Sequence, residues 1–330
     1  MGGQISEKRL KQIYEAKQEL GNTEAGKRLG VLPLTVTRRC QEYKRKYLDQ
    51  KSEKSNEKDF SINSVLKKIS EQYTAKELQA VAMGGRILPG IDKVPIVSFS
   101  GKTIRVGCIS DTHIGHQMFS KERLFQAFDA FKKAGVDFIT HSGDVCEGMS
   151  HRPGHIYELS QLGYEQQREE AVNIFSQWTD TDIYAIDGNH DRWFIKSNGA
   201  YVVKDIDRRL SNFKFIGHDE GDISLDGRAT IKLWHGEDGN SYALSYRIQK
   251  IIESLSGGEK PSILLAGHTH KYVKIFERNI TAISVGSIEA QTKWMRGKRI
   301  SAACGFCILE ITIGDHGVSK ISDTWFPFYL

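Results

Sequence analysis

The chain has 330 residues, a formal net charge of +5 and 39% hydrophobic residues, which is typical of a soluble protein with one large domain and one small domain. It contains no apolar run of about 18 residues, so we expect no membrane span and no membrane partner. Its five cysteines are an odd number, and we expect no secretory leader, because no charged segment followed by an apolar run is seen. This predicts free thiols in the cytoplasm rather than a disulfide framework.

Positive charge is concentrated at the N-terminus. Residues 1–60 hold 14 basic and nine acidic side chains, and this excess of five equals the net charge of the whole chain. The rest of the sequence is therefore neutral. A separate basic module at the N-terminus would favour an acidic partner such as nucleic acid.

Residues 1–48 have the pattern of a small helical DNA-binding module. After a first helix, we expect a short second helix from Glu24 to Leu29, ended by Gly30, and a third from about Pro33 to Tyr47. Gly26 would allow two helices to approach closely, as in a helix-turn-helix, whose recognition helix enters the major groove. The alternative is a basic helical hairpin that contacts protein. Candidate DNA contacts are Thr35, Thr37, Arg38, Arg39, Gln41, Lys44 and Arg45.

The next segment connects this module to the main domain. Residues 49–60 are nearly all polar and predict a flexible linker. Residues 61–100 are expected to form a connector with helices near 62–69 and 75–83, followed by entry strands. The catalytic domain would then occupy residues 101–330.

Five short polar motifs follow apolar runs of strand length in that domain. Residues just beyond the C-terminal ends of strands are where α/β folds gather reactive groups. Carboxylate, amide and imidazole donors without thiolates suit Mn, Fe or Zn, and the number of donors suits two ions that share a carboxylate. A single histidine is usually structural, but five ordered motifs argue against chance. The motifs are Asp111-Thr112-His113, Gly143-Asp144, Gly188-Asn189-His190-Asp191, His235-Gly236 and Gly267-His268-Thr269-His270.

The order D-x-H, G-D, G-N-H-D, H-G, G-H-x-H resembles the calcineurin-like metallophosphoesterases over roughly residues 103–315. The resemblance implies an α/β fold arranged as a four-layer α/β/β/α sandwich. It also implies two divalent metal ions, for which we expect Mn²⁺, with Fe or Zn as alternatives. By the family pattern one ion is held by Asp111, His113 and His270, the other by Asn189, His235 and His268, and Asp144 bridges the two.

The resemblance also implies catalytic roles for the third motif. His190 matches the family histidine that binds no metal and instead stabilises the transition state or protonates the leaving oxygen. Asp191 would either orient His190 or cap the following helix. A water activated by the two ions would attack phosphorus in line.

Similarity within the superfamily narrows the class of enzyme. Residues 111–147 look like the SbcD-type break-repair nucleases, and the loop at 148–155 is similar to that of the small subunits of archaeal replicative polymerases. A protein phosphatase is disfavoured, because an arginine is missing soon after Asp144 and the third motif ends in Asp191 rather than glutamate.

Two loops offer candidate substrate contacts. One follows the second motif, and the other, at residues 293–299, places Trp294 among four cations that would line a phosphate-backbone groove. For both loops an ordinary solvated surface is the alternative. The candidates are His151, Arg152, His155, Lys293 and Arg296.

These features together predict a metal-dependent DNA endo- or exonuclease that the N-terminal module brings to DNA. One alternative is a phosphodiesterase or phosphatase that acts on small or cyclic nucleotides. Another is a DNA-binding replication or regulatory factor with reduced catalysis. A homodimer is left open, because helix-turn-helix modules often act in pairs.

Overall fold

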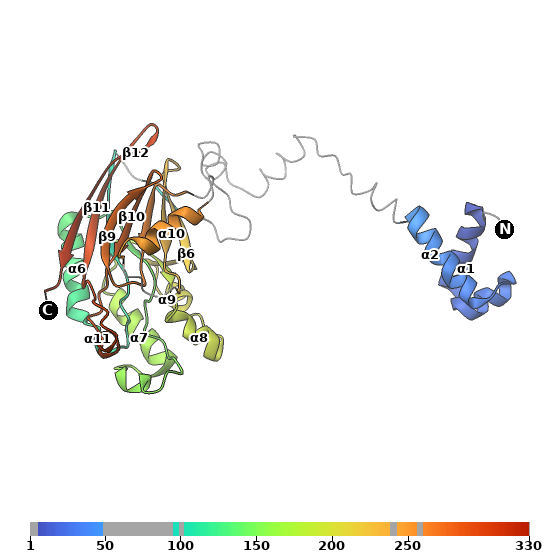
Figure 1. Cartoon of the computed structure of the whole chain (residues 1–330), viewed down its shortest axis with the longest axis horizontal. Coiled ribbons are helices and arrows are strands. Elements are labelled where there is room, and N and C mark those ends of the chain that lie inside the picture. The colour runs from blue at the N-terminus through green and yellow to red at the C-terminus, as the bar shows by residue number, and fades with distance from the viewer. Residues whose placement is uncertain (1–5, 49–94, 99–101, 238–242, 256–259, 330) are drawn as a thin grey trace. The chain divides into compact units, whose positions relative to one another are not determined.

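The structure is a computed structural model that describes residues 6–48, 95–98, 102–237, 243–255 and 260–329 (Figure 1). The chain divides into two compact units, Met1–Thr74 and Ala75–Leu330. The expected linker at 49–60 and the expected helices at 62–69 and 75–83 lie outside the described residues. Within the described ranges, no helix has the length and apolar character needed to cross a bilayer.

The N-terminal unit is built from two helical segments, α1 (Glu7–Leu29) and α2 (Pro33–Tyr43). Gly21 is non-helical, with φ 74° and ψ 176°, and it divides α1 into the two helices expected there. A Cβ atom on Gly26 would lie 2.7 Å from the Val31 carbonyl oxygen, so only glycine permits this approach. The expected third helix is shorter than predicted, because the backbone widens into a π-helical turn, η1 (Lys44–Leu48).

The second unit contains two six-stranded sheets. The strand order is β1-β6-β7-β8-β10-β9 in one and β12-β11-β2-β3-β4-β5 in the other. The strands of the first are β1 (Ile96–Val97), β6 (Glu220–Leu225), β7 (Ala229–Trp234), β8 (Ile263–Ala266), β9 (Tyr272–Glu277) and β10 (Ile280–Val285). Those of the second are β2 (Thr103–Ile109), β3 (Phe138–His141), β4 (Ile183–Asp187), β5 (Phe213–His218), β11 (Gly305–Gly314) and β12 (Gly317–Pro327).

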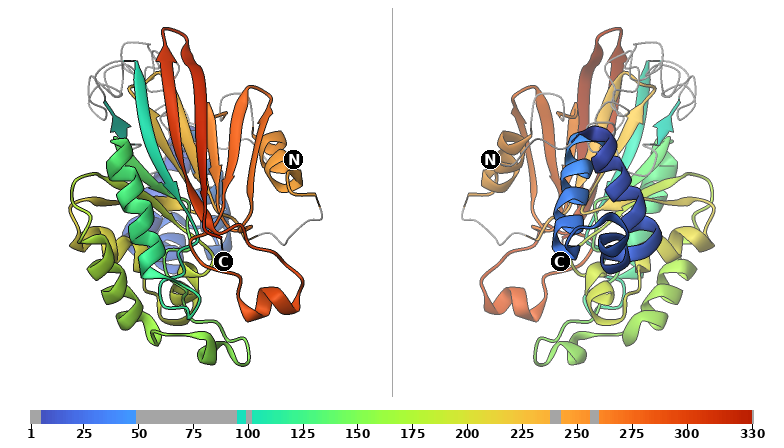
Figure 2. Two further views of the ribbon diagram at one scale, coloured as in Figure 1. Left: turned by 90° about the vertical axis from the view of Figure 1, so that its left-hand side faces the viewer. Right: turned by 90° about the vertical axis from the view of Figure 1, so that its right-hand side faces the viewer.

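Helices cover the outer faces of both sheets, so the unit is the four-layer α/β/β/α sandwich expected from the sequence (Figure 2). The described helices of this unit are α6 (Lys121–Ala134), η2 (His155–Glu158), α7 (Gly163–Phe175), α8 (Asp191–Asn198), α9 (Val202–Arg209), α10 (Tyr246–Ser254) and α11 (Lys293–Gly297). An apolar core fills the space between the sheets, a second core lies under α6, α7 and α9, and a third lies under α10.

Helix α6 shows how the sequence produces these layers. Leu124, Phe128 and Phe131 recur at helical spacing and are buried against the sheet. The Ser120 side chain accepts a hydrogen bond from the backbone of Arg123 at the N-terminus, and Gly135 ends the helix with φ 63°. The helix therefore crosses over between the parallel strands β2 and β3.

Parallel strands bring the five motifs to one edge of the sandwich. Strands β2, β3 and β4 are parallel neighbours in one sheet, and β7 and β8 are parallel neighbours in the other. Within each sheet the C-terminal ends therefore point the same way, and the motif loops follow them. Contacts between loops of the two sheets, such as the bond from the His268 N–H to Asp111 Oδ1 at 3.1 Å, bring the two sets together.

Candidate metal centre and active-site cleft

The ligand loops share an unusual backbone conformation. Five candidate ligands have positive φ angles between 49° and 70°, which is half of the ten non-glycine residues with positive φ in the described part of the chain. Side chains with a Cβ rarely adopt this conformation, and it concentrates at functional sites. The five residues are Asp111, His113, Asp144, His268 and His270.

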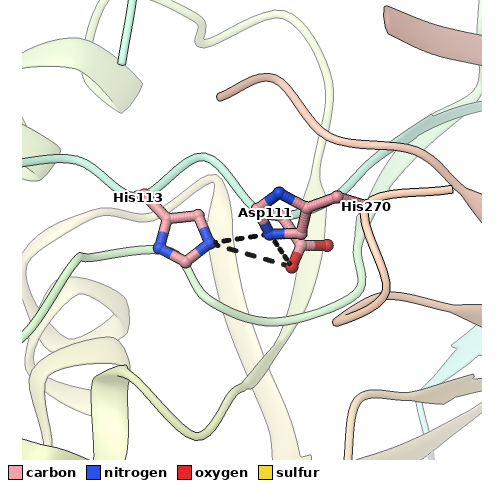
Figure 3. Close-up of side chains that lie close together, drawn as sticks. All are labelled: Asp111, His113 and His270. Carbon is pink, nitrogen blue, oxygen red and sulfur yellow. Dashed lines mark hydrogen bonds and ion pairs between the residues drawn. The ribbon is translucent and has the colours of Figure 1, made fainter. Parts of the chain in front are cut away.

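The first group of donors consists of Asp111, His113 and His270 (Figure 3). The Nε2 atoms of the two histidines lie 3.1 Å apart, and His270 Nε2 lies 3.1 Å from Asp111 Oδ1. Nε2 of His113 lies 3.8 Å from the same oxygen. Donor atoms on one cation are separated by such distances, since each would bind at about 2.0–2.2 Å. These three residues can therefore hold one ion.

The second group consists of Asn189, His235 and His268. The Asn189 Oδ1 atom lies 3.2 Å from His235 Nε2 and 3.0 Å from His268 Nδ1. Asp144 Oδ2 lies 3.0 Å from His235 Nε2 and 3.7 Å from His113 Nε2, so one carboxylate oxygen faces both groups. The seven residues proposed as ligands are thus brought together around Asp144.

Hydrogen bonds on the far sides of two histidine rings indicate that the site is built for cations. His235 Nδ1 lies 2.7 Å from the Ser142 carbonyl, which only accepts, so Nδ1 carries the proton. In the neutral ring the lone pair of Nε2 then faces two further acceptors, on Asn189 and Asp144. His113 is held in the same way, with Nδ1 2.6 Å from Glu147 Oε2. Lone pairs converging in this manner require positive charge between them, and divalent cations fit the site.

The electrostatics agree with this geometry. Burial lowers the pKa of His235, but the carboxylates of Asp144 and Asp111 outweigh it and raise the pKa to about 9. For Asp144, burial raises the pKa, yet the neighbouring His235 and His190 hold it well below its usual range. The cluster therefore stabilises ionised carboxylates together with positive charge at the ring nitrogens, and either protons or metal ions can supply that charge.

Glu147 organises three histidines beside the ligands, and the sequence alone did not single it out. Its carboxylate lies 2.6 Å from His113 Nδ1, 2.7 Å from His155 Nε2 and 3.1 Å from His190 Nδ1. It is only 4% exposed, so water does not weaken these contacts. Its position three residues after Asp144 is the one signal that would have found it.

His190 lines the cleft beside the ligands. Its backbone N–H donates to Asp144 Oδ1 at 2.9 Å, and its Nδ1 lies 3.0 Å from the Glu147 carbonyl. Burial lowers the pKa of His190, but Glu147 and Asp144 outweigh it and raise the pKa. The Trp193 ring packs against the His190 ring with centroids 3.9 Å apart, which holds the imidazole in place.

Asp191 ties the loops of the second and third motifs together. Its carboxylate accepts backbone hydrogen bonds from Val145 at 3.0 Å, Cys146 at 2.8 Å and Gly188 at 2.9 Å. Burial and the nearby Asp144 raise the pKa of Asp191 to about 7, while the bonds from Cys146 and Gly188 act in the opposite direction. With 1% exposure, Asp191 positions the loops rather than contacting a substrate, so neither orienting His190 nor capping the helix describes its contacts.

The ligands open into a cleft of about 510 Å³ that also contains Trp193, Trp294 and several carboxylates. Of the predicted substrate contacts, only Arg152 lines it, and both guanidinium NH groups donate to Glu158, at 3.1 and 2.6 Å. His155 is 1% exposed, because it packs under Glu147 and against Trp193, and is not available to a substrate. His151, Lys293 and Arg296 are exposed, and none of them is among the described residues that line the cleft.

In the N-terminal unit the candidate DNA contacts lie on α2 and the turn that follows it. Arg38, Gln41 and Lys44 are exposed, whereas Thr35 and Thr37 are half-buried. Arg39 is paired with Glu42 at 2.7 Å, which reduces its availability. Val36 and Cys40 face the opposite side and form the small core with α1. The side chain of Arg45 lies outside the described part of the structure.

A sandwich with this arrangement of ligand loops is typical of phosphoesterases. The model of the calcineurin-like phosphoesterase superfamily domain matches residues 104–312. The chain belongs to this superfamily, whose members bind divalent metals.

Curated relatives come from archaea. The DNA polymerase II small subunit of Methanothermobacter thermautotrophicus is 25% identical over 277 residues, covering 69% of this chain and 55% of the relative. That of Halobacterium salinarum is 20% identical over 278 residues, covering 71% and 53%. The chain thus spans about half the length of the curated relatives it matches.

Solved structures of similar fold have low sequence identity. An archaeal phosphodiesterase is 17% identical, with a TM-score of 0.40, and the match covers 68% of this chain and all of that one. The phosphoesterase YfcE from E. coli is 16% identical, with a TM-score of 0.38, and the match covers 66% and 98%.

Proposed function

We propose that this chain is a metal-dependent phosphodiesterase that hydrolyses phosphodiester bonds of DNA and is brought to DNA by its N-terminal unit. The observation that carries the proposal is the convergence of a full set of oxygen and nitrogen donors on the shared carboxylate of Asp144. We propose Mn²⁺ as the metal, because the site offers hard oxygen donors with imidazoles and no thiolate. The name of the archaeal relatives, a subunit of a DNA polymerase, supports DNA as the polymer.

The residues of the chain supply orientation and proton transfer. When bound, divalent cations supply charge stabilisation at the phosphate oxygens and acidify water. Glu147 and the Ser142 carbonyl fix the proton of His113 and His235 on the far nitrogen, so that Nε2 faces the site. His190, held by Glu147 and Trp193, would offset charge on the phosphate and give its Nε2 proton to the departing oxygen.

The test of this function is a cleavage assay with the full chain on single-stranded, duplex and branched DNA. We expect cleavage with Mn²⁺ and none in the presence of excess chelator. A parallel assay with bis-nitrophenyl phosphate measures phosphodiester hydrolysis without DNA. Hydrolysis of bis-nitrophenyl phosphate without DNA cleavage would favour an enzyme that acts on small nucleotides. Activity on neither substrate would favour a DNA-binding factor with reduced catalysis.

The DNA-binding role of α2 can be tested separately from catalysis. Replacing both Arg38 and Lys44 with alanine should weaken binding to a random-sequence duplex about tenfold, because each phosphate that a cation neutralises contributes a salt-dependent term. The slope of log K against log salt should fall by roughly 0.9 for each phosphate that the variant no longer neutralises. Anisotropy titrations at several salt concentrations measure both quantities. The control replaces both Lys8 and Lys11 on α1 with alanine, which removes the same two charges from exposed positions, and an equal effect there would show that α2 is not the binding helix.

A further inference from the structure

Trp294 is an exposed aromatic side chain at the edge of the metal cleft. It projects from the short helix α11, lines the cleft together with the metal ligands, and is 45% exposed. No described residue makes a ring contact with it, whereas Trp193, which also lines the cleft, is packed against His190. One side of the Trp294 indole is therefore available to a flat ligand.

The loop that carries Trp294 is fixed rigidly to the ligand loops. The backbone N–H of Glu289 donates to the Asp111 carbonyl at 3.1 Å, which ties the start of this loop to the first motif. Thr292 caps α11 by accepting from the Met295 N–H at 3.1 Å, and Met295 itself is 6% exposed. Gln291 donates to the Ile300 carbonyl at 2.7 Å and closes the loop. An exposed tryptophan on such an anchored turn loses little freedom when a ligand binds.

Charge around the cleft is distributed unevenly. The carboxylates that line it have partners: Glu158 is bound by Arg152 and Glu237 by Arg192. Among the described residues, the cations around Trp294 have no ion pair and are exposed. These cations are Lys293, Arg296, Lys298 and Arg299. These cations do not line the cleft but flank Trp294 in the chain, so the surface beside this edge of the cleft can attract phosphates.

From this arrangement we infer that the cleft takes an unpaired nucleotide, whose base stacks on Trp294 while the neighbouring phosphates lie along the exposed cations at residues 293–299. A cleft of about 510 Å³ is the size that encloses one small ligand, and a base within a duplex cannot reach Trp294 without leaving its stack. Aromatic platforms with flanking cations bind single strands in this manner. The inference rests on the proposed function and adds to it that single-stranded ends or flipped nucleotides are the substrate.

The decisive measurement is binding of the dinucleotide pTpT and of its abasic counterpart, which has the same phosphates without bases. Both are too short for a major-groove contact with the N-terminal unit. The full chain carrying His190→Ala is titrated by calorimetry in the presence of Mn²⁺. We expect pTpT to bind roughly tenfold more tightly than the abasic compound, as one base–aromatic stack would provide. Trp294→Ala should remove this difference, and Trp294→Phe should restore most of it.

The control is Phe276→Ala, which removes an aromatic side chain that is 70% exposed on β9 and does not line the cleft. It should leave both affinities unchanged. Equal binding of pTpT and the abasic compound, or a preference that survives Trp294→Ala, would overturn the stacking site. DNA turnover is measured independently with the parent chain. A stacking preference without any turnover would contradict the nuclease proposal but keep the base site, so the two failures are distinguishable.

Discussion

Replacing Asp144 with asparagine should reduce hydrolysis of DNA and of bis-nitrophenyl phosphate by about a thousandfold. Its Oδ2 atom lies 3.7 Å from His113 Nε2 in one proposed ligand group and 3.0 Å from His235 Nε2 in the other, so the substitution removes the charge that would serve both proposed ions. Several kcal/mol of transition-state stabilisation come from such a metal pair, and each 1.36 kcal/mol is about a factor of ten in rate. Initial rates at saturating Mn²⁺ measure the loss.

The same substitution should change metal binding without unfolding the protein. Asparagine tolerates the positive φ of 53° at this position and keeps the oxygen that accepts the His190 N–H. We expect Mn²⁺ to raise the melting temperature of the parent chain more than that of the variant, since ligands stabilise the state they bind. Asp226→Asn is the matched control, because Asp226 has the same φ of 53° in a turn far along the chain. Equal metal stabilisation of Asp144→Asn and the parent would contradict a shared carboxylate.

Replacing His190 with alanine should lower the turnover of DNA by about 10²- to 10⁴-fold, the range for loss of a positioned general acid. None of the seven proposed ligands is removed, so Mn²⁺ stoichiometry measured by calorimetry should stay at two. The loss should be much smaller for bis-nitrophenyl phosphate, because nitrophenolate departs without a proton while a deoxyribose oxygen needs one.

The comparison of the two leaving groups separates proton donation from a structural effect. A variant that merely disturbs the site would lose both activities to the same degree. His316→Ala provides the control, because it removes an exposed histidine from the turn between β11 and β12. Normal DNA turnover in His190→Ala would refute the role of this residue.

The ligand types and their order along the chain are local properties, which is why the sequence predicted them. Four of the five motifs combine a glycine with polar donors after an apolar strand, as Gly267, His268 and His270 do after β8. The family pattern then predicted the sandwich, and the structure agrees.

Contacts between distant loops were harder to predict. Glu147 and His155 are eight residues apart and could be substrate contacts in an open loop, but the fold buries both, and Glu147 bonds to His155 and to His113. Arg152 is similarly drawn to Glu158 through the turn of η2. In each case a polar side chain near the site bonds to another side chain of the protein. The sequence analysis had either assigned that side chain to the substrate or overlooked it.

Residue chemistry and strand-end position were readable from the amino-acid order alone, because strand periodicity, turn-forming glycine and donor type depend on neighbours in the chain. The position of each side chain in the site required the folded molecule. Asp144 lies between both ligand groups, Asp191 joins two loops, and Trp294 rather than Lys293 lines the cleft. Those positions depend on sheet register and on the left-handed backbone of the ligand loops, which bring together residues more than a hundred positions apart.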